Sequence, residues 1–433
     1  MKNQEIIITE IENPEDEAMA QALYSRSSAS ITEHIEKIKI KGSGKFMESY
    51  YVGYGHGSIG DCGTVTIYIE NVSILAAKAI QDWPLYSGQE TSTRYIDMAA
   101  QPLVDPLQTD LSKKTLDQWM QFYTEAQAET HEHLKTIYLR KEGEEEKMYE
   151  KAIKARVFDT LRAFLPAGIC TQLSWHTSLR QAAEKLALLR HHPLPEVRDI
   201  ALNIHTQLKE KFPSSFSHKT YPTQEVYNAR MVELYTYYHN ENCPEFAFSS
   251  SIDPKTLEPY SEAFTTRPIK TNLPYVTESL GDCQCDFLLD YGSSRDAQRH
   301  RNGVFRMPLL TTTLGFHQWY LDELSTETRQ KAEELIKEQI TYISDLKIDP
   351  ALLQYYIPLG FLVSCQTYYS LRQMVYVTEL RADKTVHPTY RKVAHNMHSA
   401  LKKYFPLITL HTDIDPSDWD VRRGKQDITP RAH

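Results

Sequence analysis

Two short segments, one in each half of the chain, carry residue types suited to binding phosphate. The first is Glu90-Thr91-Ser92-Thr93-Arg94-Tyr95, and the second is Arg299-His300-Arg301. A guanidinium group binds phosphate oxygens through charge-assisted, often bidentate hydrogen bonds, and a serine hydroxyl next to it adds a donor. A nucleoside monophosphate carries about two negative charges, like a phosphorylated side chain. The residue types of the two segments therefore suit an anion site, although Arg299-His300-Arg301 alone could also be a helix face that pairs with Glu or Asp.

The elements that position these segments occur twice, because the second half of the chain repeats the first. Residues 198–213 recur at 391–406 with eight identical positions, and Ser178–Gln181 recurs as Ser370–Gln373. A repeat of about two hundred residues indicates a duplicated domain rather than a solenoid. We expect the modules to span residues 1–215 and 216–433, with the boundary in the Pro-, Ser- and Thr-rich stretch 213–222.

Each module is predicted to combine a strand with several helices. Alternating β-branched residues favour a strand near 64–69, and a second strand is expected near 286–289. Apolar periodicity favours helices at roughly 110–135, 145–164, 171–190 and 195–211, and again near 323–344, 349–364, 366–381 and 388–404. Strands followed by runs of helices predict an α+β fold, present twice.

The two segments together resemble the signature of the flavin-dependent thymidylate synthases, the ThyX family. In that family Arg-His-Arg and Ser-x-Arg-Tyr lie on one continuous segment. Here each half keeps one of them: the missing Arg-His-Arg of the first half falls at Asp82-Trp83-Pro84, and the missing partner in the second half falls near 307–311. The resemblance therefore implies a composite site, with antiparallel sheets and helix bundles in both modules.

Further positions extend the resemblance. His56 and Ser58 look like the family's His-x-[Ser/Thr] pair, and Arg162 before Leu165-Pro166 looks like its phosphate-binding Arg-x-x-Leu-Pro. Gln354 and Thr277 stand at the second-half counterparts of Arg162 and His56. The implied catalytic residues are Arg190, Arg381 and His56. The implied substrate residues are Glu90, Ser92, Thr93, Arg94 and Arg162. The implied cofactor residues are Arg299, His300, Arg301, Ser58, Asp61 and Arg372, and no metal ligand is implied.

The resemblance implies FAD-dependent conversion of dUMP to dTMP, with methylenetetrahydrofolate and NADPH as co-substrates. The family builds its sites between the subunits of a homotetramer, so a duplicated chain is expected to act as a homodimer. Two alternatives remain: a flavin enzyme acting on another pyrimidine nucleotide, and a non-catalytic nucleotide- or flavin-binding assembly protein. Taken singly, Arg94 could be a surface arginine and His56 a satisfied loop histidine.

Composition restricts the partners and the compartment. The chain has 433 residues and a formal net charge of −9, which argues against a nucleic-acid or membrane-surface binder. It has no apolar run of 18 residues and no segment with the pattern of a signal peptide. Six scattered cysteines favour free thiols in a reducing cytoplasm, and Cys283-x-Cys285 is better explained by buried thiols than by a metal site.

Overall fold

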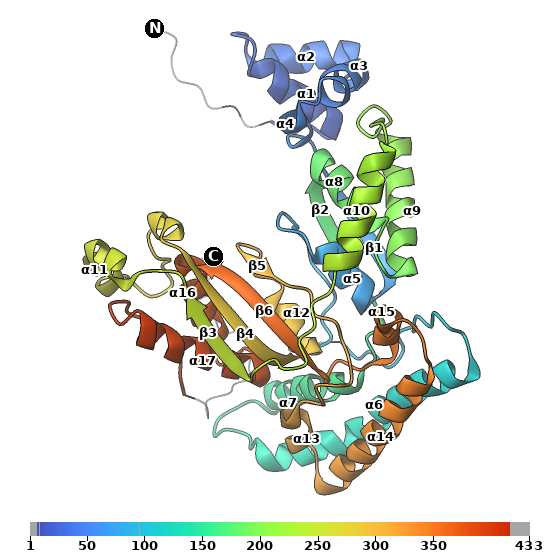
Figure 1. Cartoon of the computed structure of the whole chain (residues 1–433), viewed down its shortest axis with the longest axis vertical. Coiled ribbons are helices and arrows are strands. Elements are labelled where there is room, and N and C mark those ends of the chain that lie inside the picture. Colours follow the sequence, from blue (N-terminus) through green and yellow to red (C-terminus); the bar gives the residue numbers. More distant parts are fainter. Residues whose placement is uncertain (1–6, 8, 95, 416–433) are drawn as a thin grey trace. The chain divides into compact units, whose positions relative to one another are not determined.

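The computed structural model describes residues 7, 9–94 and 96–415, and it divides the chain into two compact units (Figure 1). Unit 1 comprises Met1–Glu70, Ala79–Glu90 and Gln172–Thr236. Unit 2 comprises Asn71–Lys78, Thr91–Thr171 and Tyr237–His433. The units differ from the two sequence modules, because residues 91–171 of the first half join the second half in unit 2. The boundary at residue 215 stays a prediction about the repeat. Tyr95, the extreme N-terminus and the tail after Asp415 lie outside the described residues.

Unit 1 is built mainly from helices of the first half. Its helical elements are α1 (Pro14–Tyr24), α2 (Ile31–Lys41), α3 (Gly44–Phe46), the π-helix η1 (Met47–Gly53), α4 (Gly57–Gly60), α8 (Leu179–Leu189), α9 (Pro195–Lys211) and α10 (Pro222–Tyr235). Strands β1 (Thr64–Ser73) and β2 (Cys170–Ser178) pair as a two-stranded sheet. Both strands and helix α5 (Ile74–Gln81) have residues in each of the two units.

Unit 2 contains a four-stranded sheet in the order β3-β4-β6-β5. Its strands are β3 (Phe246–Ser250), β4 (Asp282–Asp290), β5 (Val304–Phe305) and β6 (Leu362–Ser370). Its longer helices are α6 (Asp110–Ile137), α7 (Glu146–Leu161), α14 (Thr326–Asp345), α16 (Leu371–Arg381) and α17 (Pro388–Tyr404). Its short helical elements are η2 (Arg162–Phe164), η3 (Pro254–Tyr260), α11 (Ser261–Thr265), η4 (Tyr275–Ser279), α12 (Tyr291–Ala297), α13 (Gln318–Asp322), α15 (Pro350–Leu353) and η5 (Gln354–Tyr356).

The duplication is visible in matched elements. The run η2, β2, α8 and α9 contains 3, 9, 11 and 17 residues, and the run η5, β6, α16 and α17 contains the same numbers. Strand β1 leads directly into α5, as β4 leads directly into α12. Ser178 and Ser370 cap α8 and α16 in the same way, by accepting hydrogen bonds from the backbone N–H of Gln181 (3.2 Å) and Gln373 (3.3 Å). We therefore name residues before α10 repeat 1 and those after it repeat 2.

Two matched loops cross inside unit 2 in a reciprocal way. Gly360 N–H donates to the carbonyl of Ala163 (2.8 Å), and Gly168 N–H donates to the carbonyl of Tyr355 (3.0 Å). These four residues are pairwise equivalent in the repeats, and the bridge between Pro166 and Pro358 lies at the centre of the crossing. Such exchange of equivalent contacts is what an isologous interface between two identical subunits makes. The crossing therefore behaves as a pseudo-twofold contact within one chain.

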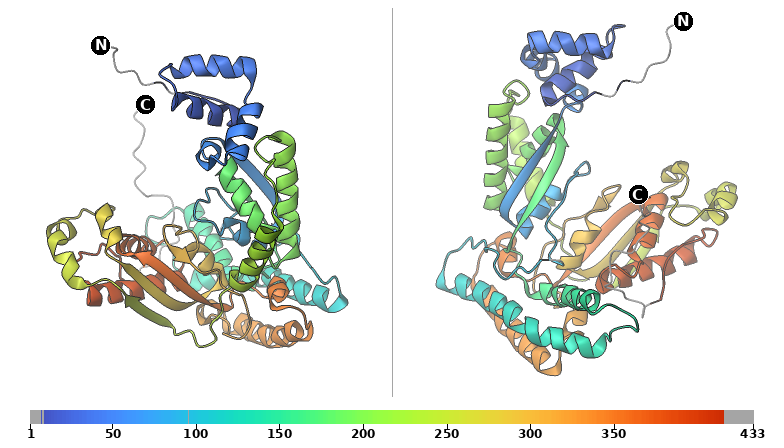
Figure 2. Two further views of the ribbon diagram at one scale, coloured as in Figure 1. Left: turned by 45° about the horizontal axis from the view of Figure 1, so that its top comes forward. Right: turned by 180° about the vertical axis from the view of Figure 1, so that it is seen from behind.

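Buried and less buried side chains alternate along β4, the strand between β3 and β6 in the sheet of unit 2. Cys283, Cys285, Phe287 and Leu289 of β4 are all fully buried, and the residues between them are less so. Strand β4 pairs antiparallel with β6 over nine residues, from Asp282 opposite Ser370 to Asp290 opposite Leu362. Helices α16 and α17 pack against each other, and both contact β4 (Figure 2). This side of the sheet forms the main core of unit 2.

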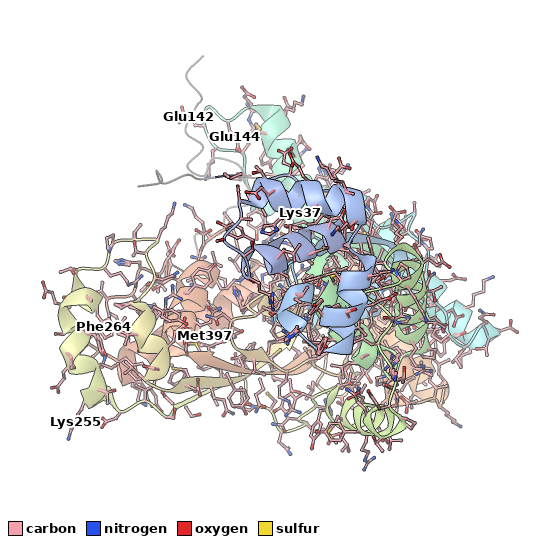
Figure 3. The ribbon with its side chains drawn as sticks, turned by 90° about the horizontal axis from the view of Figure 1, so that it is seen from above. Lys37, Glu142, Glu144, Lys255, Phe264 and Met397 are labelled. Carbon is pink, nitrogen blue, oxygen red and sulfur yellow. The ribbon has the colours of Figure 1, made fainter. Side chains whose placement is uncertain are left out.

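Helices α6, α7 and α14 of unit 2 pack together as a group. Thr109 caps α6 by accepting from the backbone N–H of Ser112 (3.1 Å), and the buried face of α6 includes Trp119 and Tyr123. Helix α6 packs on α7 and on α14 of the other repeat. Glu142 and Glu144 lie at the turn between α6 and α7 (Figure 3), in the charged run 141–147.

The predicted α+β class is confirmed, and three predicted helices are corrected. The stretch 171–190 is a strand to Ser178 and a helix only from Leu179; likewise 366–381 begins as strand β6 and becomes helical at Leu371. The stretch 349–364 contains only the short α15 and η5 before β6. The predicted helices begin as strands because tertiary contacts outweigh local preference. The backbone of β2 pairs with β1, and that of β6 pairs with β4.

All six cysteines are free thiols. Cys283 and Cys285 are buried, in agreement with the sequence interpretation, and burial raises the pKa of both thiols. Among the described residues, no group of His, Cys, Asp or Glu side chains could hold a metal ion, and no helix in this part of the chain is long and apolar enough to cross a membrane.

Candidate functional site: an arginine-lined cavity in unit 2

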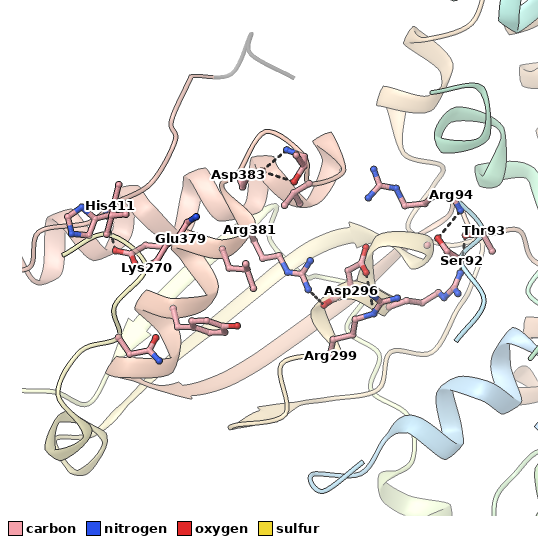
Figure 4. A pocket seen from close by; sticks show the side chains of 18 of the residues that line it. Ser92, Thr93, Arg94, Lys270, Asp296, Arg299, Glu379, Arg381, Asp383 and His411 are labelled. Atoms are coloured by element: carbon pink, nitrogen blue, oxygen red, sulfur yellow. Dashed lines mark hydrogen bonds and ion pairs between the residues drawn. The ribbon is translucent and has the colours of Figure 1, made fainter. Parts of the chain in front are cut away.

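A cavity of about 850 Å³ in unit 2 is lined by residues of both repeats (Figure 4). Ser92, Thr93, Arg94 and Arg162 come from repeat 1. Repeat 2 supplies the other lining residues. Gly292, Arg295, Asp296 and Arg299 follow β4, Lys270 precedes β4, and Glu379 and Arg381 lie on α16. This volume is typical of sites for small molecules and cofactors.

The cavity is positive although the protein is negative. Its lining contains six basic side chains and three carboxylates, an excess of three positive charges, whereas the chain carries −9. The basic residues are Arg94, Arg162, Lys270, Arg295, Arg299 and Arg381, and the acidic ones are Asp296, Glu379 and Asp383. Cationic walls that enclose a concave site attract anions.

Arg94 is held rigidly by Asp159, near the end of α7. The guanidinium makes a bidentate pair with the carboxylate, through Nε to Oδ1 and through Nη2 to Oδ2 at 2.7 Å. Burial lowers the pKa of Arg94, but the Asp159 carboxylate outweighs burial and raises that pKa above its ordinary value. Arg94 is therefore a charged, oriented group on the cavity wall.

Arg162 is almost completely buried and is held by residues of repeat 2. Its Nη2 donates to Ser293 Oγ (2.8 Å) and lies 3.4 Å from the Tyr320 hydroxyl. The Tyr320 hydroxyl in turn donates to Asp290 Oδ2 (2.7 Å), which lies 3.9 Å from Arg162 Nη2. Burial lowers the pKa of Arg162, but Tyr320 and Asp290 more than compensate and raise it. The charge is thus retained inside the protein.

Arg299 and Arg381 flank Asp296 at the C-terminal end of α12 (Figure 4). Arg299 Nε lies 3.4 Å from Asp296 Oδ1, and Arg381 Nη2 donates to the carbonyl of Asp296 (3.0 Å). Burial would raise the pKa of Asp296, but Arg299 and Arg381 hold it well below its ordinary value. Asp296 is therefore an ionised carboxylate among arginines.

His300 supports Arg381 from outside the cavity lining. Arg381 Nε donates to His300 Nε2 (2.8 Å), so this nitrogen must be unprotonated. Burial and the Arg381 guanidinium hold the pKa of His300 well below its ordinary value. A neutral His300 with its hydrogen on Nδ1 is the form that can orient Arg381.

The arginines share one arrangement. Arg94, Arg162 and Arg381 are each fixed through Nη2, and Arg94 and Arg381 also through Nε, whereas no Nη1 atom of the three has a hydrogen-bond partner among the described residues. Arg299 is half exposed. Preoriented guanidinium groups with free N–H donors can bind an oxyanion with little loss of side-chain entropy.

Six predicted site residues therefore line one cavity: Ser92, Thr93, Arg94, Arg162, Arg299 and Arg381. The others do not line it. His56, Ser58, Asp61, Glu90 and Arg190 belong to unit 1. His56 is exposed and stacks on Tyr54 with ring centroids 6.2 Å apart. Asp61 accepts from Arg180 (2.9 Å) and Ser178 (3.1 Å), while Glu90 accepts from Gln81 (2.9 Å).

Two predicted cofactor residues of repeat 2 also lie off the cavity lining. Arg372 donates to the carbonyl of Leu273 (2.9 Å) and pairs with Glu278 (2.9 Å), which fixes the segment before β4. Arg301 Nη1 donates to the carbonyl of Arg299 (3.4 Å). Within the Arg-His-Arg segment, Arg299 lines the cavity, and His300 acts behind it.

Arg190 and Arg381 are not equivalent positions. Helix α8 begins at Leu179 and α16 at Leu371, and each has 11 residues, so Arg381 matches Leu189 and Arg190 matches Ala382. One residue shifts a side chain by about 100° around a helix. Arg190 accordingly pairs with Glu225, whereas Arg381 faces Asp296.

Sequence reasoning missed several residues of this site. Asp296 and Arg295 lie within the arginine-rich segment but have no partner in the family signature. Asp159 precedes Arg162 by three residues, but the sequence did not show that it holds Arg94. The segment 269–272 and His411 line the far end of the cavity, and nothing in the sequence pattern indicated their role.

The chain is similar in sequence to known proteins. Residues 7–214 match the model of the family described as "Thymidylate synthase complementing protein". A UPF0159 protein of Chlamydia muridarum is 25% identical, over 92% of this chain and 86% of the relative. One of Chlamydia pneumoniae is 25% identical over 88% and 83%, and one of Thermoplasma acidophilum is 21% identical over 95% and 98%. Residues 7–214, slightly less than half of the chain, are thus similar to the thymidylate synthase complementing proteins.

Proposed function

We propose that the protein is a flavin-dependent thymidylate synthase that converts dUMP to dTMP in the arginine-lined cavity of unit 2. FAD is the proposed cofactor, and methylenetetrahydrofolate and NADPH are the proposed co-substrates. The observation that carries this proposal is the meeting of Arg94 and Arg162 from repeat 1 with Arg299 and Arg381 from repeat 2. Ser92 and Arg94 of one ThyX-like segment and Arg299 of the other are far apart in the sequence but line one cavity.

The charge of the cavity supports a nucleotide ligand. The lining has an excess of three positive charges, and the Asp159 and Asp290 carboxylates behind Arg94 and Arg162 reduce it to one. A phosphate with about two negative charges would therefore be bound mainly by the remaining N–H donors of the arginines. Ser92 and Arg94 would bind the nucleotide with Arg162 on its phosphate. Because Asp159, Ser293 and Tyr320 already fix Arg94 and Arg162, little ordering remains for binding.

The residues present also fit the phosphate groups of FAD. Arg299 is half exposed at the cavity wall and is oriented by Asp296. Gly292 lines the cavity, and a side chain there would come within 3.2 Å of Asp290 Oδ2 and 3.5 Å of Arg162 Nε, so glycine leaves room beside the arginine. Bound flavin would supply the redox chemistry, and the chain would supply orientation and charge.

Arg381 is the residue best suited to stabilise the reacting base. Its charged guanidinium is held by His300 and the carbonyl of Asp296, with Nη1 left for a ligand. A fixed cation beside a pyrimidine ring stabilises negative charge that develops on the ring, and it does so without reorganisation.

The reciprocal loop crossing supports a homodimer as the working assembly. One chain already contains the pseudo-twofold contact around Pro166 and Pro358. Two chains would then provide four repeats, as in the homotetramer that the family resemblance implies.

The test uses the purified full chain. We expect FAD-type absorbance and dTMP formation from dUMP when the co-substrates are added. Arg94→Ala removes a charge-assisted contact worth roughly 1.5–3 kcal/mol, so dUMP affinity should fall about tenfold or more. Thr311→Ala, in the degenerate segment of repeat 2, is the matched control and should change little. Equal effects of the two substitutions, or turnover of another pyrimidine nucleotide but not dUMP, would contradict the proposal.

A further inference from the structure

We infer that Ser293, Thr389 and His387 are positioning residues that connect Arg162 to Arg94 through a buried chain of hydrogen bonds. Arg162 Nη2 lies 2.8 Å from Ser293 Oγ, which lies 2.8 Å from Thr389 Oγ1. Thr389 Oγ1 lies 2.8 Å from His387 Nδ1, and His387 Nε2 lies 3.3 Å from the carbonyl oxygen of Asp159. The carboxylate of that same Asp159 holds Arg94.

One assignment of donors and acceptors uses all four of these contacts. The Asp159 carbonyl can only accept, so His387 Nε2 carries the hydrogen and Nδ1 accepts. The Thr389 hydroxyl then donates to Nδ1, and its oxygen accepts from the Ser293 hydroxyl. Ser293 Oγ in turn accepts from Arg162. Each hydroxyl donates once and accepts once along this path. Two longer contacts lie beside it, because Ser293 Oγ is 3.4 Å from His387 Nδ1 and Thr389 N–H donates to the same nitrogen (3.4 Å). Removing the Thr389 hydroxyl therefore breaks the path at its two 2.8 Å bonds.

The surroundings prevent these groups from turning to other partners. Ser293 and His387 are fully buried, and Thr389 is 3% exposed. The His387 ring packs edge-on against Trp319, with centroids 4.7 Å apart, and beside Tyr320 at 5.4 Å. Burial and the Arg162 and Arg94 charges hold the pKa of His387 well below its ordinary value, which favours the neutral ring that the chain requires.

The hydrogen-bond path has no counterpart at the equivalent positions of the other repeat. The start of α5 at Ile74 matches the start of α12 at Tyr291, so Ala76 stands where repeat 2 has Ser293. Pro195 and Pro388 both begin matched helices, so Leu194 and Glu196 correspond to His387 and Thr389. Repeat 1 therefore lacks all three groups, and repeat 2 has Gln354 in place of Arg162. Repeat 2 supplies the hydrogen-bond chain, and repeat 1 supplies the arginines that it connects.

This arrangement explains how both arginines can face one ligand. If the proposed function holds, the phosphate of the nucleotide contacts Arg162 and Arg94 together, and the spacing between them must match one anion. A connection through three buried side chains fixes that spacing more firmly than two independent ion pairs would. The inference concerns the paired arginines, so it can be tested with a simple anion as well as with dUMP.

The experiment measures the binding of inorganic phosphate and of dUMP to the full chain by titration calorimetry. Thr389→Val keeps the shape but removes the hydroxyl, and it should weaken both ligands roughly three- to tenfold. Thr389→Ser keeps the hydroxyl and should restore most of the affinity. Thr130→Val is the matched control, because Thr130 is fully buried on α6 and its hydroxyl has no partner among the described residues.

A double-mutant comparison distinguishes positioning of Arg94 from a general effect of Thr389 on the fold. In an Arg94→Ala background, Thr389→Val should have little further effect on phosphate binding. Additive losses, failure of Thr389→Ser to restore binding, or a wild-type chain that binds no phosphate would overturn the inference. A wild-type chain that binds phosphate but not dUMP would instead reject the proposed function, and the phosphate affinities of the variants would still test the hydrogen-bond chain.

Discussion

The turns η2 and η5 have the same length, the same position in their repeats and the same burial, yet they use their first side chain differently. Arg162 of η2 reaches out of its own repeat to Ser293 and Tyr320. Gln354 of η5 stays within its repeat: its Oε1 accepts from Leu310 N–H (3.0 Å), and its Nε2 donates to the Ala351 carbonyl (3.0 Å). One backbone plan thus supports a cavity-lining arginine in one repeat and an amide bonded within its own repeat in the other.

The comparison shows how a duplicated domain can specialise. After duplication, one copy of each functional segment is sufficient if the site draws on both copies. The unused positions then serve packing, as Gln354 does and as Trp83 does at the counterpart of His300, where its Nε1 donates to Gln181 (2.8 Å). A cavity lined by both repeats needs only one copy of each segment, so the second copy of each could be lost.

The largest effect is expected from making the two turns alike. Arg162→Gln removes the buried charge and leaves Asp290 without its cationic neighbour, 3.9 Å away. We expect dUMP affinity to fall about tenfold to a hundredfold and the melting temperature to decrease, because a buried carboxylate loses its compensation. Calorimetric titration and thermal unfolding measure the two effects. Unchanged dUMP affinity would mean that η2 and η5 do not differ in function.

A smaller effect should separate the members of the Arg-His-Arg segment. Arg299→Ala should lower FAD occupancy, because Arg299 lines the cavity, whereas Arg301→Ala should leave it nearly unchanged, because Arg301 does not. Absorbance of the purified variants near the flavin bands gives the occupancy directly. Equal flavin loss in both variants would show that the whole segment binds, and not one arginine of it.

The smallest effect on ligand binding is expected from substituting Lys185 of α8. Lys185 of α8 is buried and donates to the Asp82 carbonyl (2.7 Å), whereas Val377 occupies the matched position of α16. Burial lowers the pKa of Lys185 from 10.5 to about 8. Between these values the unfolded lysine binds more protons than the folded one, so the free energy of unfolding should rise with pH.

The measurement compares unfolding of the wild type and Lys185→Met by urea between pH 7 and pH 10.5. The wild type should gain stability relative to the variant above about pH 8, and dTMP formation should be the same in both. Parallel stability profiles would show that Lys185 titrates normally.

The sequence was informative where chemistry or local periodicity determines structure. The apolar spacing of residues 110–135 predicted α6 closely, and Pro388 marked the start of α17. The arginine segments predicted four of the cavity's arginines. The strands β2 and β6 were missed because their sequences continue into good helix formers, and only pairing with β1 and β4 makes them extended.

Long-range contacts account for what the sequence could not predict at the site. Asp159 is three residues from Arg162 but acts on Arg94, 65 residues away. His387 reads locally as a helix cap, accepting from Thr389 N–H, while its other nitrogen reaches repeat 1. The apparent match of Arg190 with Arg381 failed because it is one residue out of step with the start and end of α8 and α16, which only the helix bounds reveal.

The central claim is that one chain builds one site from both of its repeats, and mixing two defective chains tests it most directly. At dUMP and FAD concentrations that only just saturate the wild type, Arg94→Ala and Arg299→Ala chains are each expected to form much less dTMP, and both residues belong to the cavity of a single unit 2. When the two variants are co-expressed and purified as mixed dimers, every site still lacks one arginine. We therefore predict no recovery of dTMP formation. Partial recovery would show that the two arginines of a working site come from different chains, and it would contradict the account.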